Sequence, residues 1–457
     1  MSLRSAMGLD ASVTYSFLAR SVSIVGSAGT VLLIVRVLNP IEQGYYYTLL
    51  SLVALQVVFE MGMSVVVQQL AAHECVHLRL NMDGTTNGNI EAHARLASVL
   101  QLSLRWYTIA AAIMGLFLAP LGMAFFEMHS AGNQGSIAWR GPWLMGVIAS
   151  MAGLWCAPLY SFLEGCGQVR EVAAMRLWQA VAATAMAWTA MALHHGLYSP
   201  ALVILGQVGA GLIFLSARRR FFFELLQHSI GDHRIRWRTE VWPFQWRIAV
   251  SWVSSYLTVQ IFIPILFAIR GAVESGQMGM TLSITGYMTI LALSWTSTKA
   301  TPFGRMIASR QFHALDRLFR RTLGQSLAAY AVVALFACGG MYSLRAVAPG
   351  LADRLLPPHL FVALILGAGA NCAVQCVGTL LRSFKHEPFL YQSLVVAVIA
   401  LVLAALTAPR WGNAGASLSY LVATGGVALP SALTILVRAR RRYLKPGILQ
   451  AFSGEAA

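Results

Sequence analysis

The sequence predicts an all-α, polytopic membrane protein with about twelve transmembrane helices, and three observations lead to this class. Hydrophobic residue types make up 57% of the 457 residues, and charged types make up only 11%. A soluble globular chain is about one quarter charged. The mean hydropathy is +0.65. The apolar residues also gather in stretches of roughly twenty, the length of a membrane-spanning helix, whereas the strands of a membrane β-barrel are stretches of about ten residues with alternating polarity.

The apolar stretches form two sets of six. The first set lies near 13–35, 45–67, 106–126, 143–163, 174–193 and 197–216, and the second near 248–269, 280–298, 326–343, 358–380, 391–408 and 414–437. We therefore expect two six-helix lobes around a central cleft. The expected divisions are an N-lobe at 1–216, a linker at 217–247, a C-lobe at 248–437 and a basic tail at 438–457.

The distribution of basic residues predicts the orientation. If the N-terminus lies inside, only six of the 33 Lys and Arg residues fall in outside segments, and the other 27 fall in inside segments. The six are Arg36, Arg140, Arg270, Arg345, Arg354 and Arg410. Basic residues are enriched in cytoplasmic loops, so both termini are predicted to be cytoplasmic. The same rule accounts for the net charge of +16 and argues against a nucleic-acid partner.

The linker combines bases with aromatic residues. Arg218, Arg219 and Arg220 precede three phenylalanines, and Arg234, Arg236 and Arg238 lie among tryptophans. Such a segment is expected to lie on the anionic inner leaflet, with membrane lipids as its partners.

The two halves resemble repeats. Glu42-x-Gly44 in the first half matches Glu274-x-Gly276 in the second. Cys156-Ala157 followed by Glu171 matches Cys372-Ala373 followed by Glu387 at a constant offset. Six spans per half would make these parallel repeats about an axis along the membrane normal. Small polar residues on the first helix of each half (Ser23, Ser27 and Thr30; Ser251, Ser254 and Thr258) are then predicted to face the cleft.

Glu60 is the first candidate functional residue. It lies about two-thirds along the second span, in the run Val57–Gly62. A carboxylate at membrane depth costs roughly 3 kcal/mol even on the lenient insertion scale, and such residues usually face a cavity or a partner. We interpret Glu60 as a proton-coupling or substrate-contacting group. The alternative is a structural pair with an Arg or Ser of a neighbouring helix.

Three basic residues lie at the ends of spans, namely Arg36, Arg270 and Lys299. Only fifteen residues separate Arg20 from Arg36, which corresponds to about 22 Å of helix against a hydrocarbon core of about 30 Å. Cationic side chains near a cleft suit anionic groups such as a pyrophosphate, and we therefore predict substrate contact. Snorkelling to the headgroups explains their positions equally well.

Polar amides at Gln260 and Asn371 lie within apolar spans. They are further candidates for substrate contact, although amides also join helices to one another. Pro158 and Pro264 lie within spans and are expected to kink them. No disulfides are expected among the six cysteines, and Cys372 and Cys376, four apart on an apolar helix, are expected to be packing thiols.

Signals for enzymes, metals and cofactors are poor. The sequence has no P-loop, no Rossmann fingerprint and no GxSxG. The predicted outside connections are short, whereas a membrane enzyme acting on polysaccharide would need a larger platform. We therefore expect no catalytic residues, no metal and no cofactor.

Several stretches resemble bacterial polysaccharide flippases of the Wzx type, in the superfamily that also holds MATE exporters and lipid II flippases. These are Arg36–Tyr45 (RVLNPIEQGY) with Glu60–Gly62 (EMG), Leu163–Val169 (LEGCGQV), Lys299–Arg305 (KATPFGR) and Leu315–Arg321 (LDRLFRR). One departure is Glu60, where the family often has an aspartate. The likeness is patchy but extends over both predicted lobes.

This resemblance implies an alternating-access transporter that flips an undecaprenyl-pyrophosphate-linked oligosaccharide from the inner to the outer leaflet, for lipopolysaccharide or exopolysaccharide biosynthesis. It implies the bacterial inner membrane as location, and a polysaccharide polymerase with other assembly proteins as candidate partners. A MATE-like cation-coupled multidrug antiporter is the main alternative, and a membrane-embedded polysaccharide-assembly enzyme is the third.

Overall fold

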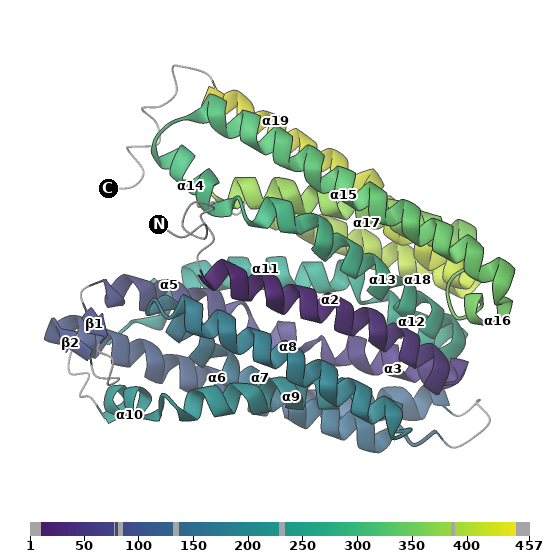
Figure 1. Ribbon diagram of the computed structural model, residues 1–457, viewed down its shortest axis with the longest axis horizontal. Coiled ribbons are helices and arrows are strands. Elements are labelled where there is room, and N and C mark those ends of the chain that lie inside the picture. Colours follow the sequence, from purple (N-terminus) through teal and green to yellow (C-terminus); the bar gives the residue numbers. More distant parts are fainter. Residues whose placement is uncertain are drawn as a thin grey trace. The chain divides into compact units, whose positions relative to one another are not determined.

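The computed structural model describes residues 11–76, 78–80, 86–130, 137–227, 234–384 and 389–444. Its described residues are almost entirely helical, as predicted (Figure 1). One short antiparallel hairpin, β1 (Leu78–Leu80) with β2 (Thr86–Gly88), was not predicted. The chain forms two compact units, Met1–Val253 and Ser254–Ala457. The four-part division made from the sequence stays a prediction.

Each predicted span coincides with helix, and the helices of the first unit follow the first set. They are α2 (Ala11–Val37), α3 (Pro40–Val53), α4 (Gln56–Glu60), α5 (Met63–Cys75), α6 (Ile90–Ser130), α7 (Arg140–Gly165), α8 (Val169–Ala192), the 3-10 turn η1 (Gly196–Tyr198), α9 (Ser199–Ser216), α10 (Arg219–Gln227) and the π-helical turn η2 (Trp237–Val241). The next helix, α11 (Trp242–Val259), contains the boundary between the units.

The start of α3 shows why the chain turns where it does. The side chain of Asn39 accepts hydrogen bonds from the backbone N–H groups of Ile41 and Glu42 at 3.0 and 2.8 Å. The Glu42 carboxylate in turn accepts the Asn39 N–H at 2.9 Å. This reciprocal pair is a capping box. Pro40 suits the first helical position, because proline has no backbone N–H and the N–H at this position would have no partner within the helix. The short Asn39–Glu42 sequence therefore ends one span and begins the next.

The second span is not the continuous helix that the apolar stretch 45–67 predicts. Its two parts, Pro40–Glu60 and Met63–Cys75, are bent by 43° at a break. Met61 (φ 51°) and Gly62 (φ 65°) are both left-handed. A Cβ atom at Gly62 would lie 2.2 Å from Cγ2 of Ile248, so both the backbone conformation and the close approach of α11 require glycine.

Small residues bring α2 close to α8. A Cβ atom on Gly26 would overlap the Thr184 side chain, at 2.3 Å from its Oγ1, and one on Gly29 would lie 2.5 Å from the Trp188 ring. The Trp188 indole donates to the Thr30 hydroxyl at 3.2 Å. This is the packing expected of membrane helices, where small residues permit close contact. Thr30, predicted to face a cleft, therefore contacts α8.

The second unit follows the second set of apolar stretches. Its elements are α12 (Phe262–Arg270), α13 (Ala272–Ser297), α14 (Ala300–Ala308), α15 (Phe312–Val347), α16 (Pro349–Ala352), α17 (Pro358–Arg382), α18 (Leu390–Leu421), the π-helical η3 (Val422–Ala428) and α19 (Leu429–Leu444). A kink at Gly412 (φ 53°) divides α18 and separates the predicted spans 391–408 and 414–437.

Proline explains a second broken span. Gln245–Val259 and Phe262–Arg270 are bent by 41° at their junction. Pro264 has no N–H to donate to the carbonyl of Gln260, and its ring crowds that carbonyl. The kink predicted at Pro264 is thus confirmed, whereas Pro158 lies inside α7 without a break.

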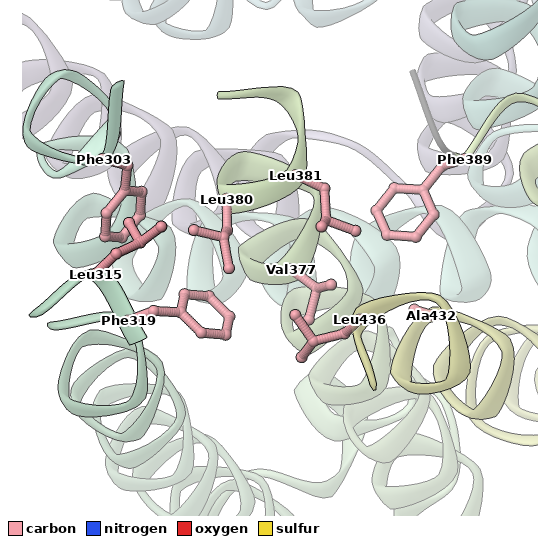
Figure 2. Close-up of a cluster of buried hydrophobic side chains, with 9 residues drawn as sticks. All are labelled: Phe303, Leu315, Phe319, Val377, Leu380, Leu381, Phe389, Ala432 and Leu436. Atoms are coloured by element: carbon pink, nitrogen blue, oxygen red, sulfur yellow. The ribbon is translucent and has the colours of Figure 1, made fainter. Parts of the chain in front are cut away.

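A buried apolar cluster joins one end of α15, α17 and α19 (Figure 2). Its members are Phe303, Leu315, Phe319, Val377, Leu380, Leu381, Phe389, Ala432 and Leu436. Beside it, Asp316 accepts hydrogen bonds from Arg440 at 2.7 Å and pairs with Arg320 at 3.0 Å. The two contacts tie the C-terminal helix to the beginning of α15.

Within the described residues, seven helices are long and apolar enough to cross a membrane, or up to nine if each bent pair is one span. One of the seven is the stretch Leu390–Arg441, which contains the Gly412 kink and two of the predicted spans. The helices α8 and α13, of 24 and 26 residues, lie at two further predicted spans. Large apolar side chains on the helices remain exposed, including Leu335 at 74% and Phe336 at 77%, as expected where lipid replaces water. The protein is thus a polytopic α-helical membrane protein.

Candidate functional site

Glu60 lies at the break in the second span, as the last residue of α4. Its Oε1 atom accepts a hydrogen bond from the Ser64 hydroxyl at 2.6 Å and one from the Tyr107 hydroxyl at 3.4 Å. Tyr107 is fully buried in α6, and the Glu60 carboxylate itself is half-buried. Three elements of the first unit thus position one acidic group.

The break gives this carboxylate a favourable electrostatic setting. Ser64 belongs to the first turn of α5, so the hydrogen bond holds Glu60 beside the N-terminus of that helix. The positive end of a helix dipole stabilises a negative charge there. A continuous helix would have carried the same side chain away from any helix start. The left-handed residues Met61 and Gly62 therefore create the environment of Glu60.

Ser64 and Tyr107 were not predicted as partners of Glu60. Ser64 lies four residues away, which on an uninterrupted helix is an ordinary packing distance. Tyr107 is separated from Glu60 by 47 residues, and nothing in the sequence connects the two.

Arg36 lies in the last turn of α2 and its side chain is exposed. The helix has 27 residues, about 40 Å in length, so it extends well beyond the interval between Arg20 and Arg36. At a helix C-terminus the guanidinium is stabilised by the dipole. Lys299 is similarly exposed, between the end of α13 and the start of α14.

Arg270, predicted to contact substrate at the end of a span, already has an ion-pair partner. Its Nε atom lies 3.2 Å from the Glu274 carboxylate. The same carboxylate accepts the backbone N–H of Asn413 at 2.9 Å, next to the Gly412 kink. Asn413 also donates its side-chain amide to Gln277 at 2.8 Å. Arg270 therefore belongs to a polar cluster that joins α12, α13 and the second half of α18.

The two amides have different surroundings. Gln260 lies at the break between α11 and α12, where its backbone N–H is bonded to the carbonyl of Tyr256 at 2.8 Å. Asn371 lies within α17 and its side chain forms a hydrogen bond with Tyr420. The Asn371–Tyr420 bond fits the alternative to substrate contact, in which an amide joins one helix to another.

The contacts of each candidate lie within its own unit. The contacts of Glu60 lead to α5 and α6, those of Arg270 to α13 and α18, and that of Asn371 to Tyr420. Among the residues that the structure describes, no group of three or more His, Cys, Asp or Glu is arranged to hold a metal ion.

The linker contributes an ion-pair network to the first unit that the sequence did not reveal. Arg95 in α6 pairs with Glu74 of α5 and Glu240 of η2, each at 2.8 Å. Partial burial raises the pKa of Glu240, but the Arg236 backbone N–H and the Arg95 guanidinium outweigh it, so the pKa lies below its ordinary value. The network fixes the second half of the linker against α5 and α6.

Linker aromatics also pack on the first unit. Phe221 and Phe222 are buried beside Phe162 of α7, and Trp237 stacks on Trp106 of α6 with ring centroids 5.9 Å apart. These aromatic residues therefore have protein neighbours. Location of the linker on the membrane surface stays a prediction, as does the cytoplasmic position of both termini. Lys385, Glu387 and Lys445, used in the predictions of orientation and repeats, lie outside the described residues.

No protein-family model and no curated protein sequence matches the chain. Solved structures do match at the level of fold. The MATE multidrug transporter DinF-BH superposes with a TM-score of 0.60 at 15% identity, over 95% of this chain and 96% of the other. A variant of the Vibrio cholerae MATE transporter VcmN gives 0.59 at 14%, over 95% and 97%.

The lipid II flippase MurJ, in an inward closed conformation, matches with a TM-score of 0.54 at 13% identity, over 95% of this chain and 90% of that one. These neighbours are transporters. The likeness extends over nearly the whole of each chain, so the described chain has the fold shared by MATE transporters and lipid II flippases, that of the MOP superfamily.

Proposed function

We propose that this protein is an alternating-access transporter that flips an undecaprenyl-pyrophosphate-linked oligosaccharide from the inner to the outer leaflet of the bacterial inner membrane, for surface polysaccharide biosynthesis. The observation that carries the proposal is the whole-length fold likeness to transporters, one of which is a flippase for lipid II. The stretches that resemble Wzx-type flippases support a lipid-linked sugar as the cargo.

Charge supports an anionic cargo. A pyrophosphate is best recognised by guanidinium and ammonium groups. Arg36 and Lys299 are exposed at helix ends and can approach such a group. Arg270 is a weaker candidate than the sequence suggested, because Glu274 already neutralises its charge at 3.2 Å.

A MATE-like cation-coupled multidrug antiporter is the second candidate, and the surroundings of Glu60 are compatible with it. The carboxylate with the Ser64 and Tyr107 hydroxyls forms a set of oxygen atoms that suits a proton or a small cation. In the flippase the same group would serve as the coupling site. The group therefore supports a transporter without choosing the cargo.

Deletion of the gene in its native host tests the cargo. If the protein is the flippase, the deletion strain accumulates undecaprenyl-linked repeat units on the inner leaflet and loses surface polymer. The wild-type gene then reverses both effects. Complementation with Glu60→Gln at matched protein levels tests the coupling role in the same assay. A membrane-embedded assembly enzyme would instead leave flipped repeat units unpolymerised at the outer leaflet.

Normal surface polymer without accumulated lipid-linked intermediate would overturn the flippase. A simultaneous increase in sensitivity to cationic drugs, reversed by the wild-type gene, would establish the antiporter. Protein levels measured in the membrane fraction serve as the control for every variant.

A further inference from the structure

Two cysteines of the first unit face each other across the contact between α5 and the turn after α7. The Sγ atoms of Cys75 and Cys166 lie 2.9 Å apart, and both thiols are free and half-buried. A disulfide bond is about 2.05 Å long. The two sulfurs therefore have to approach by less than 1 Å to form one.

The surrounding backbone fixes this pair. Gly165, next to Cys166, has no room for a side chain: a Cβ atom there would lie 2.5 Å from the Gln68 carbonyl oxygen and 2.7 Å from the Ala71 Cβ atom. The end of α7 thus packs closely against α5. On the other side, Glu74 holds the end of α5 to α6 through Arg95 at 2.8 Å.

The pair also lies at an accessible position. Cys75 is the last residue of α5 and Cys166 follows α7, so both are at helix ends and not within the apolar core. Val76, which follows Cys75, is 77% exposed. Small oxidants can reach such thiols, whereas fully buried ones are inert.

We propose that Cys75 and Cys166 form a site of reversible oxidation, at which a peroxide converts the two thiols into a disulfide. The Cys75 thiolate attacks one peroxide oxygen, the O–O bond breaks, and one water leaves after protonation, with Cys75 as sulfenic acid. The Cys166 thiolate then attacks that sulfur, the S–O bond breaks, and a second water leaves. Two thiols are oxidised by two electrons and one hydrogen peroxide is reduced to two waters.

The other described cysteines provide the comparison. Cys372 and Cys376 are both fully buried and lie one turn apart on α17, an arrangement in which helix geometry does not allow an unstrained disulfide. Cys156 is also buried, and Cys338 is half-buried within the long apolar helix α15. Oxidation should therefore select one pair among the six cysteines.

The test treats the full-length protein, in lipid vesicles, with hydrogen peroxide. Remaining thiols are blocked with a maleimide, and the protein is digested without reductant for peptide mapping by mass spectrometry. The expected product is a cross-linked pair of peptides that contain Cys75 and Cys166. The titratable thiols of the denatured protein should fall from six to four, and dithiothreitol should restore six.

Cys75→Ser and Cys166→Ser should each abolish the cross-link, whereas the matched control Cys156→Ser should retain it. The proposal would be overturned if the peptides with Cys75 and Cys166 were recovered separately, each labelled with maleimide, under conditions in which other thiols of the protein had been oxidised. A cross-link to a different cysteine would overturn it as well. The wild-type mapping decides the question even if a variant fails to fold.

Discussion

The carboxylate of Glu274 accepts the backbone N–H of Asn413 at 2.9 Å, and so fixes the chain where α18 resumes after its kink. The preceding residue, Gly412, has φ 53°, and a Cβ atom on it would lie 2.3 Å from the Glu274 Oε2 atom. Glu274 holds Arg270 with its other oxygen. One acidic side chain therefore orders the ends of three helices.

Gly412→Ala should destabilise the protein by about 1–3 kcal/mol, because alanine adds strain at positive φ and collides with Glu274. Thermal unfolding of the purified variant measures the effect. Gly324→Ala in α15 is the matched control, since a Cβ atom there meets nothing within 4 Å, and its midpoint should be unchanged or higher. Equal midpoints for the Gly412 variant and the wild type would contradict the role of the Glu274 cluster.

Arg36→Ala and Arg270→Ala should behave differently. Removal of Arg270 leaves Glu274 without its ion-pair partner, so stability should fall by roughly 1 kcal/mol. Removal of Arg36 should leave the unfolding midpoint unchanged and weaken binding of a pyrophosphate-bearing lipid by about tenfold, since charge-assisted hydrogen bonds contribute about 1.5–3 kcal/mol. Binding to vesicles that contain a polyprenyl pyrophosphate, with polyprenyl monophosphate for comparison, checks this. Unchanged binding in the Arg36 variant would exclude it as a cargo contact.

Gly62→Ala should disturb the break between α4 and α5. The φ of 65° disfavours any Cβ atom at this position, and a Cβ atom would lie 2.2 Å from Cγ2 of Ile248. The free energy of unfolding should therefore fall by about 1–3 kcal/mol. Addition of Ile248→Ala should relieve the collision but not the backbone strain, so the double variant should recover only part of the loss. Full recovery of the stability would mean that packing against Ile248 alone, and not the backbone conformation, requires glycine at position 62.

Glu60→Gln should reduce transport by roughly tenfold or more, because a coupling free energy of 1–3 kcal/mol corresponds to about 5–150-fold. Tyr107→Phe removes only the longer of the two hydrogen bonds to the carboxylate, at 3.4 Å, and a loss of about 1 kcal/mol or less is expected. Accumulation of lipid-linked intermediates in complemented strains ranks the two variants. Wild-type transport by the Glu60 variant would mean that Glu60 has a structural role and does not couple transport.

Glu240 should stabilise the protein at neutral pH, and this stabilisation should be lost in acid. Its pKa lies below the ordinary value of 4.5 in the folded protein, so its contribution is present above that value and is lost as the pH falls through the folded pKa. Glu240→Gln should therefore narrow the difference in unfolding midpoint between pH 7 and pH 4. Glu224→Gln, on the same linker, makes the same change in charge away from Arg95. An identical pH dependence for the wild type and both variants would show that the pair with Arg95 carries no net stabilisation.

The sequence predicted the helices far better than their interruptions. Hydropathy identifies a stretch such as 45–67 as apolar, but it averages across Met61 and Gly62 and so misses the left-handed turn. The kink at Pro264 was predictable because proline removes a specific hydrogen bond. The Asn39–Glu42 capping box was present in the sequence as local spacing, although these residues were interpreted only as parts of a repeat and of a family resemblance.

Partners far apart in the sequence could not be predicted from it. Arg95 meets Glu240 across 145 residues, and Glu60 meets Tyr107 across 47. Periodicity and composition describe neighbours along a helix, whereas these pairs depend on which helices pack side by side. Arg270 was predicted to be open to an anion because its partner Glu274 was considered only as a repeat marker.

The interruption at Met61 and Gly62 has a consequence for solvent. A helix that stops within the hydrocarbon layer releases carbonyl and amide groups from their helical partners, and such groups are tolerated at that depth only beside other protein or in a hydrated cavity. Amide protons near Glu60 should then exchange with deuterated water far faster than those in the middle of α7, which has no such break. Fast exchange there would place water inside the second span, at the point where it stops being a helix.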